Sequence, residues 1–220
     1  MRVMRVMENW IQFIQPYSQD VNELIFKFQE YQEQFAQTGQ HVPIELVTGR
    51  VKTLASIEEK MKRRNIPLSR LDPDMEDIAG VRIVCQFVED IYQVVALIRR
   101  RQDFKILEER DYISNRKPSG YRSYHIIIEY PVQTLTDIKV VKAEIQVRTM
   151  AMNFWATIEH SLNYKYHGQF PHELAQRLQK SAEATFLLDT EMSNIRDEIQ
   201  KAQKEFEHRK NKGGHPHLFQ

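Results

Sequence analysis

The sequence predicts an α+β fold in which a mixed, largely antiparallel sheet is flanked by helices, with a long helix at each end of the chain. Three observations predict this class. Near both ends, apolar residues recur every three or four positions, as they do along the buried face of a helix. Between the ends, short segments alternate apolar and polar residues, as half-buried strands do. The 220 residues include only 7 glycines and 8 prolines, without a linker-like run, so we expect one central domain with helical extensions.

The two terminal segments are predicted to be long helices. Residues 1–40 form the first, whose main part is expected to begin near Pro16, because proline suits the first turn of a helix. Residues 169–210 form the second, which we expect to mediate oligomerisation, and residues 211–220 are expected to be a disordered tail. The apolar faces of both helices either pack on the domain core or meet another subunit, and the pattern leaves both interpretations open.

The central domain is expected to cover residues 41–168. Its predicted elements, in chain order, are a basic helix at 45–64, a turn at 71–74, a strand at 80–87, a helix at 91–100, strands at 104–112, 122–130 and 138–147, and a helix at 149–164. In the first of these strands, alternation places Val81, Ile83 and Cys85 on one face and Arg82 on the other.

The composition excludes several classes of protein. Lysine and arginine number 31 against 30 for aspartate and glutamate, so bulk charge alone does not hold the chain on nucleic acid or a membrane. Cys85 is the single cysteine, which excludes an intrachain disulfide framework and a cysteine-cluster zinc site. No apolar run approaches the ~20 residues that span a bilayer, and the N-terminus lacks the apolar stretch of a secretory signal. We therefore expect a cytoplasmic protein that makes no membrane contact.

One strand carries polar side chains where an apolar face would be ordinary. Alternation puts Glu144, Gln146 and Arg148 on the same face, which is either exposed to solvent or lines a site. In the following helix Asn153 and His160 are seven residues apart and share a face, which favours a binding cleft that continues from the strand. The opposite face of that helix carries three apolar residues that we expect in the core, Trp155, Ile158 and Leu162.

Two carboxylates are candidates for a metal site. Asp77 precedes the first central strand, and Gly80 there allows a close approach of the backbone. Asp77 and Glu144, at the ends of neighbouring strands, could together hold one Mg²⁺, which takes one or two carboxylates plus phosphate oxygens. Spacing alone leaves open the alternative that Asp77 only caps an element.

Two basic segments are candidates for phosphate binding. Residues 117–125 combine a basic turn with Tyr121, which suits a phosphate and a stacked base, although a surface turn has the same composition. Lys52, Ser56 and Lys60 are four residues apart and form one polar stripe, either a clamp for a triphosphate or a solvated helix face. No glycine-rich phosphate loop occurs, so side chains would have to hold the phosphates.

Four segments together resemble the synthetase domain of the RelA/SpoT family of alarmone enzymes, a nucleotidyltransferase-like domain. They are TGRVK at 48–52, DIAGVRI at 77–83, KPSGYRSYH at 117–125 and EIQVRTMAMNFWATIEHSLNYKY at 144–166. The likeness covers nearly the whole chain, and its length and flanking helices resemble the small, single-domain members of the RelQ type.

This resemblance implies transfer of the β,γ-pyrophosphate of ATP to the ribose 3′-hydroxyl of GDP or GTP, which yields AMP and ppGpp or pppGpp. Glu144 would be the base that deprotonates the hydroxyl, and Asp77 and Glu144 would hold Mg²⁺. The residues implied to bind ATP are Arg50, Lys52, Ser56, Lys60, Arg63, Arg64 and Arg82, the first and last of them around the adenine. The residues implied to bind GDP or GTP are Arg110, Lys117 and His125 at the phosphates, Tyr121 and Asn153 at the guanine, and Gln146 in support.

The sequence also departs from longer and from closely similar members of this family. It contains no His-Asp dipeptide, so we expect synthesis without hydrolysis of the alarmone. Members of the RelQ type assemble as tetramers that pppGpp activates. The cleft that binds this pppGpp uses cations on the first helix and an aromatic residue before TGRVK. The matching positions here are Ile25, Gln29 and Leu46, with only Lys27 nearby. We expect a homotetramer in which activation by pppGpp is weak or absent, since this anion site lacks its cations.

Two other functions compete with this interpretation. A polymerase-β-like nucleotidyltransferase would carry Gly-Ser followed by Asp-x-Asp, but residues 72–74 read Asp-Pro-Asp without a preceding Gly-Ser, and the proline favours a turn. The alternative from another class is an RNA-binding tetramer with secondary or lost catalysis, because some relatives bind single-stranded RNA. The sequence leaves RNA binding, and the choice between GDP and GTP as acceptor, open.

Overall fold

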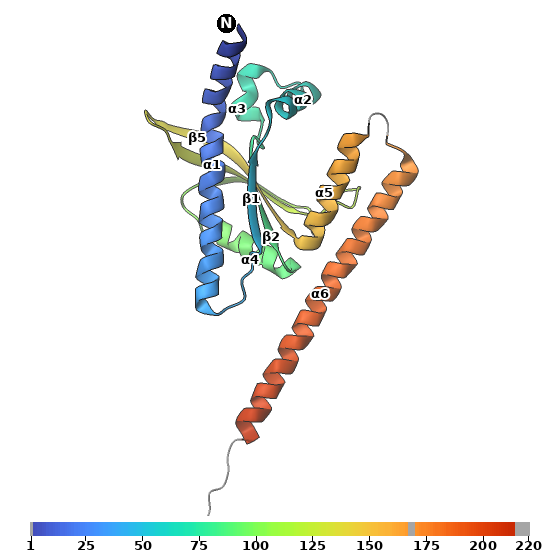
Figure 1. Ribbon diagram of the computed structural model, residues 1–220. Coiled ribbons are helices and arrows are strands. Elements are labelled where there is room, and N and C mark those ends of the chain that lie inside the picture. The colour runs from blue at the N-terminus through green and yellow to red at the C-terminus, as the bar shows by residue number, and fades with distance from the viewer. Residues whose placement is uncertain (1, 167–169, 214–220) are drawn as a thin grey trace, which may run out of the picture.

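The computed structural model of the protein describes residues 2–166 and 170–213 (Figure 1). One sheet contains the strands β1 (Leu46–Val51), β2 (Ala79–Cys85), β3 (Lys105–Asp111), β4 (Tyr124–Gln133) and β5 (Ile138–Thr149). The helices are α1 (Arg2–Thr38), α2 (Leu54–Arg64), α3 (Leu71–Asp74), α4 (Val88–Arg99), α5 (Met150–Lys165) and α6 (His172–Gly213), with a 3-10 turn at Leu68–Arg70. The strand order is β1-β2-β5-β4-β3, and only the β2–β5 pair is parallel among the four pairs of this sheet. The predicted α+β class, with a mixed and largely antiparallel sheet, is confirmed.

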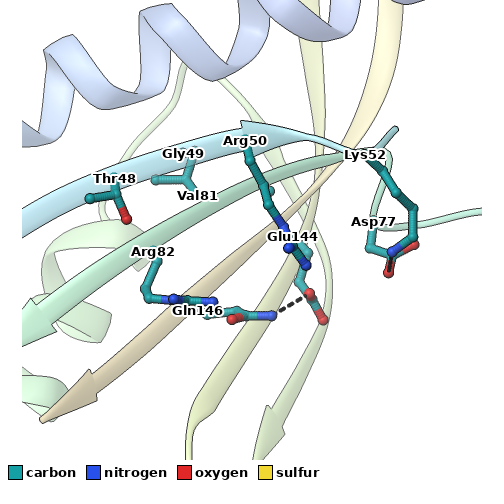
Figure 2. Close-up of a pocket in the computed structure, with 10 residues that line it drawn as sticks. Thr48, Gly49, Arg50, Lys52, Asp77, Val81, Arg82, Glu144 and Gln146 are labelled. Carbon is teal, nitrogen blue, oxygen red and sulfur yellow. Dashed lines mark hydrogen bonds and ion pairs between the residues drawn. The ribbon is translucent and has the colours of Figure 1, made fainter. Parts of the chain in front are cut away.

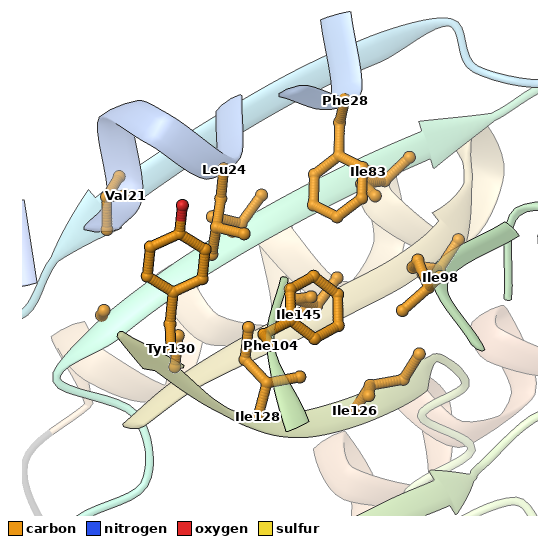
Figure 3. Packing of buried hydrophobic residues seen from close by; sticks show 14 of the residues in the cluster. Val21, Leu24, Phe28, Ile83, Ile98, Phe104, Ile126, Ile128, Tyr130 and Ile145 are labelled. Carbon is orange, nitrogen blue, oxygen red and sulfur yellow. The ribbon is translucent and has the colours of Figure 1, made fainter. Parts of the chain in front are cut away.

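The hydrophobic core lies between the sheet and the helices α1 and α4. Leu24 and Phe28 of α1 are completely buried and face Ile83 of β2 and Ile145 of β5 (Figure 3). Ile98 of α4 extends the same cluster. At about 25 cal/mol for each Å² of apolar surface, burying one such side chain contributes about 1.5–3 kcal/mol, so this face of the sheet anchors both helices.

The opposite face of the sheet carries polar residues in register across all five strands. Cα partners run from Thr48 on β1 to Arg82 on β2, Gln146 on β5, His125 on β4 and Arg110 on β3. A neighbouring row joins Arg50, Gly80 and Glu144 in the same way. Side chains of register partners point to the same side of a sheet, so this topology gathers residues from five separate strands into one polar surface.

The predicted helix at 45–64 is wrong over its first part. Residues 46–51 form strand β1, which pairs antiparallel with β2, and the helix begins only after Thr53, whose side chain accepts a hydrogen bond from the Ser56 backbone amide. The strand contains two valines and a threonine, whose branched side chains favour strands over helices. At Gly49 a Cβ atom would lie 2.6 Å from Cγ1 of Val21, so α1 crosses β1 closely where no side chain intervenes.

Pro16 does not begin the main N-terminal helix, because α1 continues through it from Arg2 to Thr38. A proline inside a helix costs about 3 kcal/mol through its missing N–H and its ring. Tyr17, Val21 and Leu24 directly after it are buried on the sheet, and this packing outweighs the local preference. Tertiary contacts therefore decide where this helix runs.

Two smaller expectations also differ from the structure. The turn predicted at 71–74 is the short helix α3, which follows the 3-10 turn. Of the apolar residues expected in the core along α5, Trp155 is buried against α6, whereas Ile158 and Leu162 are 46% and 47% exposed. The reason is that α5 packs against α6 along only part of its length, and in Figure 1 these two helices run side by side away from α1.

The long C-terminal helix presents much of its apolar face to solvent in the single chain. From Leu187 onward, its exposed apolar residues are Leu187, Leu188, Met192, Ile195, Ile199 and Phe206. Of the tail predicted to be disordered, residues 211–213 belong to α6, and residues 214–220 lie outside the described residues. Within the described ranges, the helices are each too short or too polar to cross a membrane.

Candidate active site

Two adjoining cavities open on the polar face of the sheet. The first, of about 190 Å³, lies over β1, β2 and β5 (Figure 2). Its predicted site residues are Arg50, Lys52, Asp77, Arg82, Glu144 and Gln146. The second, of about 240 Å³, lies beside α2, and its predicted site residues are Arg50, Lys52, Ser56, Lys60, Arg63 and Asp77. Arg50, Lys52 and Asp77 line both, so the two cavities form one continuous site.

Glu144 is the carboxylate at the floor of the first cavity. Its side chain is 15% exposed, and both oxygens accept a hydrogen bond: Oε1 from His125 Nδ1 at 2.8 Å and Oε2 from Gln146 Nε2 at 2.7 Å. Figure 2 shows the hydrogen bond from Gln146. Burial raises the pKa of Glu144, but the hydrogen bond and electrostatic interaction with His125 and the hydrogen bond from Gln146 lower it by more, so the net pKa lies below its ordinary value. Glu144 is therefore an ionised, fixed acceptor at neutral pH.

A chain of hydrogen bonds supports this carboxylate from behind. Arg148 donates to the Tyr121 hydroxyl at 2.7 Å, and that hydroxyl lies 2.8 Å from His125 Nε2. Arg148 also donates to Gln146 Oε1 at 2.5 Å. Because Nδ1 of His125 must donate to the carboxylate, a neutral ring accepts from the Tyr121 hydroxyl at Nε2. Both partners of Glu144 are thus held in place by Arg148, one directly and one through Tyr121.

Asp77 is the second carboxylate, and two lysines surround it. Lys52 Nζ donates to Oδ2 at 2.8 Å, and Lys60 Nζ lies 2.7 Å from Oδ1 (Figure 2 shows Lys52 beside Asp77). Burial raises the pKa of Asp77, but the two lysines lower it more, so the pKa falls below its ordinary value. Burial also lowers the pKa of Lys60 despite its acidic partner. The arrangement joins the two ends of the predicted Lys52–Lys60 stripe at one carboxylate.

The two carboxylates fit a divalent ion of the Mg²⁺ type. They line the same cavity, and the charge of Asp77 raises the pKa of Glu144, as expected of near neighbours. Oδ1 of Asp77 is buried and makes no well-directed hydrogen bond despite the nearby lysine. The described residues contain no cluster of three or more histidine, cysteine or acidic side chains, so a metal here would take two carboxylates and complete its shell from phosphates or water.

Two arginines, Arg50 and Arg82, line the first cavity together with these carboxylates. Burial, together with the charges of Arg148 and Arg50, lowers the pKa of Arg82 to about 10. Nε of Arg82 is buried and has no hydrogen-bond partner among the described residues. Arg50 and Arg82 line the first cavity, and the charge of Arg148 acts on Arg82 from beside it, which is an environment that an anionic or aromatic ligand stabilises.

Four predicted residues that line neither cavity lie on β3, on β4 or in the loop between them: Arg110, Lys117, Tyr121 and His125. Lys117 Nζ lies 4.3 Å from the ring centre of Tyr112 and 4.9 Å from that of Tyr121. Arg110 of β3 is paired with Glu76 at 3.1 Å and with Glu108.

Asn153 lies at the start of α5, with its side-chain oxygen buried and unpartnered within the described part of the chain. The β3–β4 loop carries Gly120 at φ +87°, where a Cβ atom would lie 2.6 Å from Cβ of Ala182 on α6. Helix α6 therefore supports the loop that holds Tyr121.

The structure thus joins most of the predicted site residues, but Arg64, Arg110, Lys117 and Asn153 line neither cavity. Arg64 lies on the exposed end of α2. Sequence reasoning missed Thr48, Thr53 and Tyr112, which lie at the site but carry no unusual local signal. Thr53 was detectable as a helix cap, since threonine commonly precedes a helix.

Comparison with known proteins identifies the family. Residues 49–169 match the model of the region found in RelA / SpoT proteins. GTP pyrophosphokinase YjbM of Bacillus subtilis is 52% identical over 206 residues, which cover 94% of this chain and 97% of that relative. The structure of small alarmone synthetase 1 from Bacillus subtilis bound to its product pppGpp has a TM-score of 0.85 at 52% identity, covering 88% of this chain and 99% of that chain.

A second structure of small alarmone synthetase 1 from Bacillus subtilis, bound to AMPCPP, has a TM-score of 0.78 at 47% identity, covering 88% of this chain and 99% of that chain. These matches confirm the family and the enzyme class that the four sequence motifs predicted. They extend over most of the chain and so reach well beyond the residues of the catalytic region. The chain therefore belongs to the RelA/SpoT family, with the small alarmone synthetases.

Proposed function

We propose that the chain is a GTP pyrophosphokinase that transfers the β,γ-pyrophosphate of ATP to the ribose 3′-hydroxyl of GDP or GTP. The products are AMP and ppGpp or pppGpp, and the chain synthesises the alarmone without hydrolysing it. The observation that most strongly supports this proposal is the ionised Glu144, which accepts two hydrogen bonds at the floor of a cavity. The other charged groups that line this cavity are mostly cationic. The relatives bound to pppGpp and to AMPCPP, an analogue of ATP, support the two substrate classes.

The donor nucleotide fits the cavity beside α2. Lys52, Ser56, Lys60 and Arg63 line it and present hydroxyl and cationic donors that suit a triphosphate. Arg50 and Arg82 line the first cavity, and planar guanidinium groups stack on an aromatic base such as adenine. We assign Arg64 a weaker, long-range contribution to the phosphates, because its charge reaches Lys60 but its side chain does not reach the cavity.

The acceptor nucleotide fits the β3–β4 side of the site. Tyr121 offers its ring to guanine, and the unpartnered oxygen of Asn153 accepts from an exocyclic amino group such as that of guanine. We assign Arg110, Lys117 and His125 to the acceptor's phosphates. Lys117 rests on the rings of Tyr112 and Tyr121, so guanine stacking would displace its ammonium group toward the phosphates.

The reaction needs positioning and charge neutralisation more than covalent help from the protein. Glu144 accepts the proton of the 3′-hydroxyl as the 3′-oxygen forms a bond to the β-phosphorus of ATP. The bond from that phosphorus to the oxygen bridging to the α-phosphate breaks, and AMP leaves with this oxygen. Asp77 and Glu144 are the residues that would hold Mg²⁺, which when bound neutralises charge on the transferred group. Gln146 and His125 keep the carboxylate oriented toward the cavity.

The test is to incubate the purified chain with Mg²⁺, ATP and either GDP or GTP, and to resolve the nucleotides by anion-exchange chromatography. AMP and ppGpp or pppGpp should appear together and disappear in Glu144→Gln, which keeps the shape but not the charge. Release of pyrophosphate instead of AMP would indicate nucleotidyl transfer. If neither acceptor yields a product, the proposal fails, and binding of single-stranded RNA becomes the function to examine.

We also propose that the chain acts as a homotetramer assembled through its terminal helices. Support comes from the apolar residues that α6 exposes in the single chain. Exposed apolar surface of this kind is typical of protein–protein interfaces. Light scattering measured with size-exclusion chromatography tests this: a mass near 26 kDa, that of one chain, would contradict it.

A further inference from the structure

Helix α6 packs on both segments that the proposed function assigns to guanine, the loop with Tyr121 and the start of α5 with Asn153. At Gly120, next to Tyr121, a Cβ atom would lie 2.6 Å from Cβ of Ala182 on α6. On α5, Trp155 Nε1 donates hydrogen bonds to two groups of α6, at 3.1 and 2.9 Å. The cavity left between the loop, α5 and α6 measures only about 10 Å³, so the three elements are closely packed. None of the described residues of α6 lines either of the two larger cavities of the site.

Arg122 ties the loop to this helix electrostatically. It directly follows Tyr121, is buried, and its guanidinium carbon lies 3.9 Å from the ring centre of Phe186 on α6. Its Nε is buried without a hydrogen-bond partner among the described residues, so the charge depends on nearby acids. Burial lowers the pKa of Arg122, and the charges of Glu183 and Asp189 on α6 oppose this shift. The loop is therefore held by the aromatic face and the carboxylates of α6.

Asp189 joins the same helix to the start of α5. It is buried, and its Oδ2 accepts a hydrogen bond from the Thr149 hydroxyl at 2.6 Å. That hydroxyl oxygen also accepts from the Met152 backbone amide at 3.0 Å, so Thr149 caps the N-terminus of α5. Burial raises the pKa of Asp189 to about 6, which leaves the group ionised at pH 8. Because Asn153 directly follows Met152, Asp189 fixes the helical turn that carries it.

We propose that Asp189 is a positioning residue for the acceptor nucleotide. Through Arg122 it holds the loop with Tyr121, and through Thr149 it holds the turn with Asn153. This inference rests on the proposed function and deepens it by naming what shapes the guanine subsite. The residues that fit the donor's phosphates lie instead on and beside α2. Loss of the Asp189 charge should therefore weaken binding of the acceptor much more than binding of the donor.

The test is Asp189→Asn, which keeps the shape of the side chain and removes its charge. Isothermal titration calorimetry with Mg²⁺ at pH 8 measures the Kd of AMPCPP for the full-length chain, and then the Kd of GDP for the chain saturated with AMPCPP. Nothing turns over, because AMPCPP carries carbon at the bond that the reaction breaks. The Kd of GDP should rise about tenfold or more, and that of AMPCPP should change little. Glu191→Gln is the matched control, since Glu191 lies on the same helix and is exposed.

A second pair of variants separates positioning from a general loss of structure. Thr149→Val removes the hydroxyl that links Asp189 to α5 and should also raise the Kd of GDP, whereas Thr149→Ser keeps the hydroxyl and should retain the wild-type value. Circular dichroism checks that each chain is folded, and the Thr149 pair decides the matter if Asp189→Asn does not fold.

Three results would overturn the proposal: an unchanged Kd of GDP in the folded variants, an equal loss of affinity for both nucleotides, or the same loss in Glu191→Gln. A wild-type chain that binds no GDP would overturn it together with the proposed function. A wild-type chain that binds both nucleotides but forms no ppGpp from ATP would refute the proposed function alone.

Discussion

Asp20 provides a test of how a buried carboxyl group makes the stability of this fold depend on pH. It lies on α1 within the core and is completely buried, and neither carboxylate oxygen has a hydrogen-bond partner in the described structure. Burial, with a smaller contribution from the charge of Glu23, raises the pKa of Asp20 from 3.8 to about 8, although Lys27 lowers it. The folded chain therefore holds the protonated acid at neutral pH, whereas the unfolded chain ionises it.

The magnitude follows from the two pKa values. Because the folded pKa is the higher one, the folded state binds the proton more tightly. The stability that Asp20 contributes is then fully present below pH 3.8, and it is lost as the pH rises to about 8. At 1.36 kcal/mol for each unit, the loss by pH 7 is about 4 kcal/mol. An asparagine of the same shape does not titrate, but its buried amide without a hydrogen-bond partner lowers the free energy of unfolding by about 1–3 kcal/mol.

We therefore expect Asp20→Asn to stabilise the chain by about 1–3 kcal/mol at pH 7 and to give little or no stabilisation at pH 5. The assay is urea unfolding followed by circular dichroism, for both chains, at one protein concentration and at several pH values from 5 to 8. Other titrating groups are common to the two chains and cancel in the difference. A difference in unfolding free energy that does not change with pH would refute the reasoning.

Three further predictions concern packing, catalysis and regulation. Gly49→Ala should lower the free energy of unfolding in urea by about 1–3 kcal/mol, because the new methyl group would lie 2.6 Å from the stiff side chain of Val21. Unchanged stability would show that α1 can move off β1. Tyr121→Phe keeps the ring but removes the hydroxyl beside His125 Nε2, so kcat should fall about tenfold while KM for the acceptor changes little; a rise in KM alone would place the hydroxyl in binding. Addition of pppGpp should leave the initial rate of ppGpp formation unchanged, because Lys27 is engaged by Asp103 at 2.8 Å and is not available to an anion; a clear rise at micromolar pppGpp would contradict this.

Much of the local structure could be predicted from the sequence. Alternation along β2 and β5 predicted which residues face the core and which face the site, and Val81 and Ile145 are indeed buried while Glu144 lines the cavity. The successive four-residue spacing of Lys52, Ser56 and Lys60 predicted a shared surface, and both lysines reach Asp77. This held even though residues 46–51 are a strand, because only Thr53 separates Lys52 from the helix that carries Lys60.

The sequence by itself determined the chemistry of the site: the carboxylates, the basic stripe, and the four motifs that identify the family. Only the tertiary structure decided which of these groups touch. Parallel pairing of β2 with β5 places Arg82 beside Gln146, and β4 on the other side of β5 brings His125 to Glu144. Periodicity reports on neighbours within one element, a few residues apart. Strand order depends on pairings between residues far apart in the chain, and no local pattern records which strands will meet.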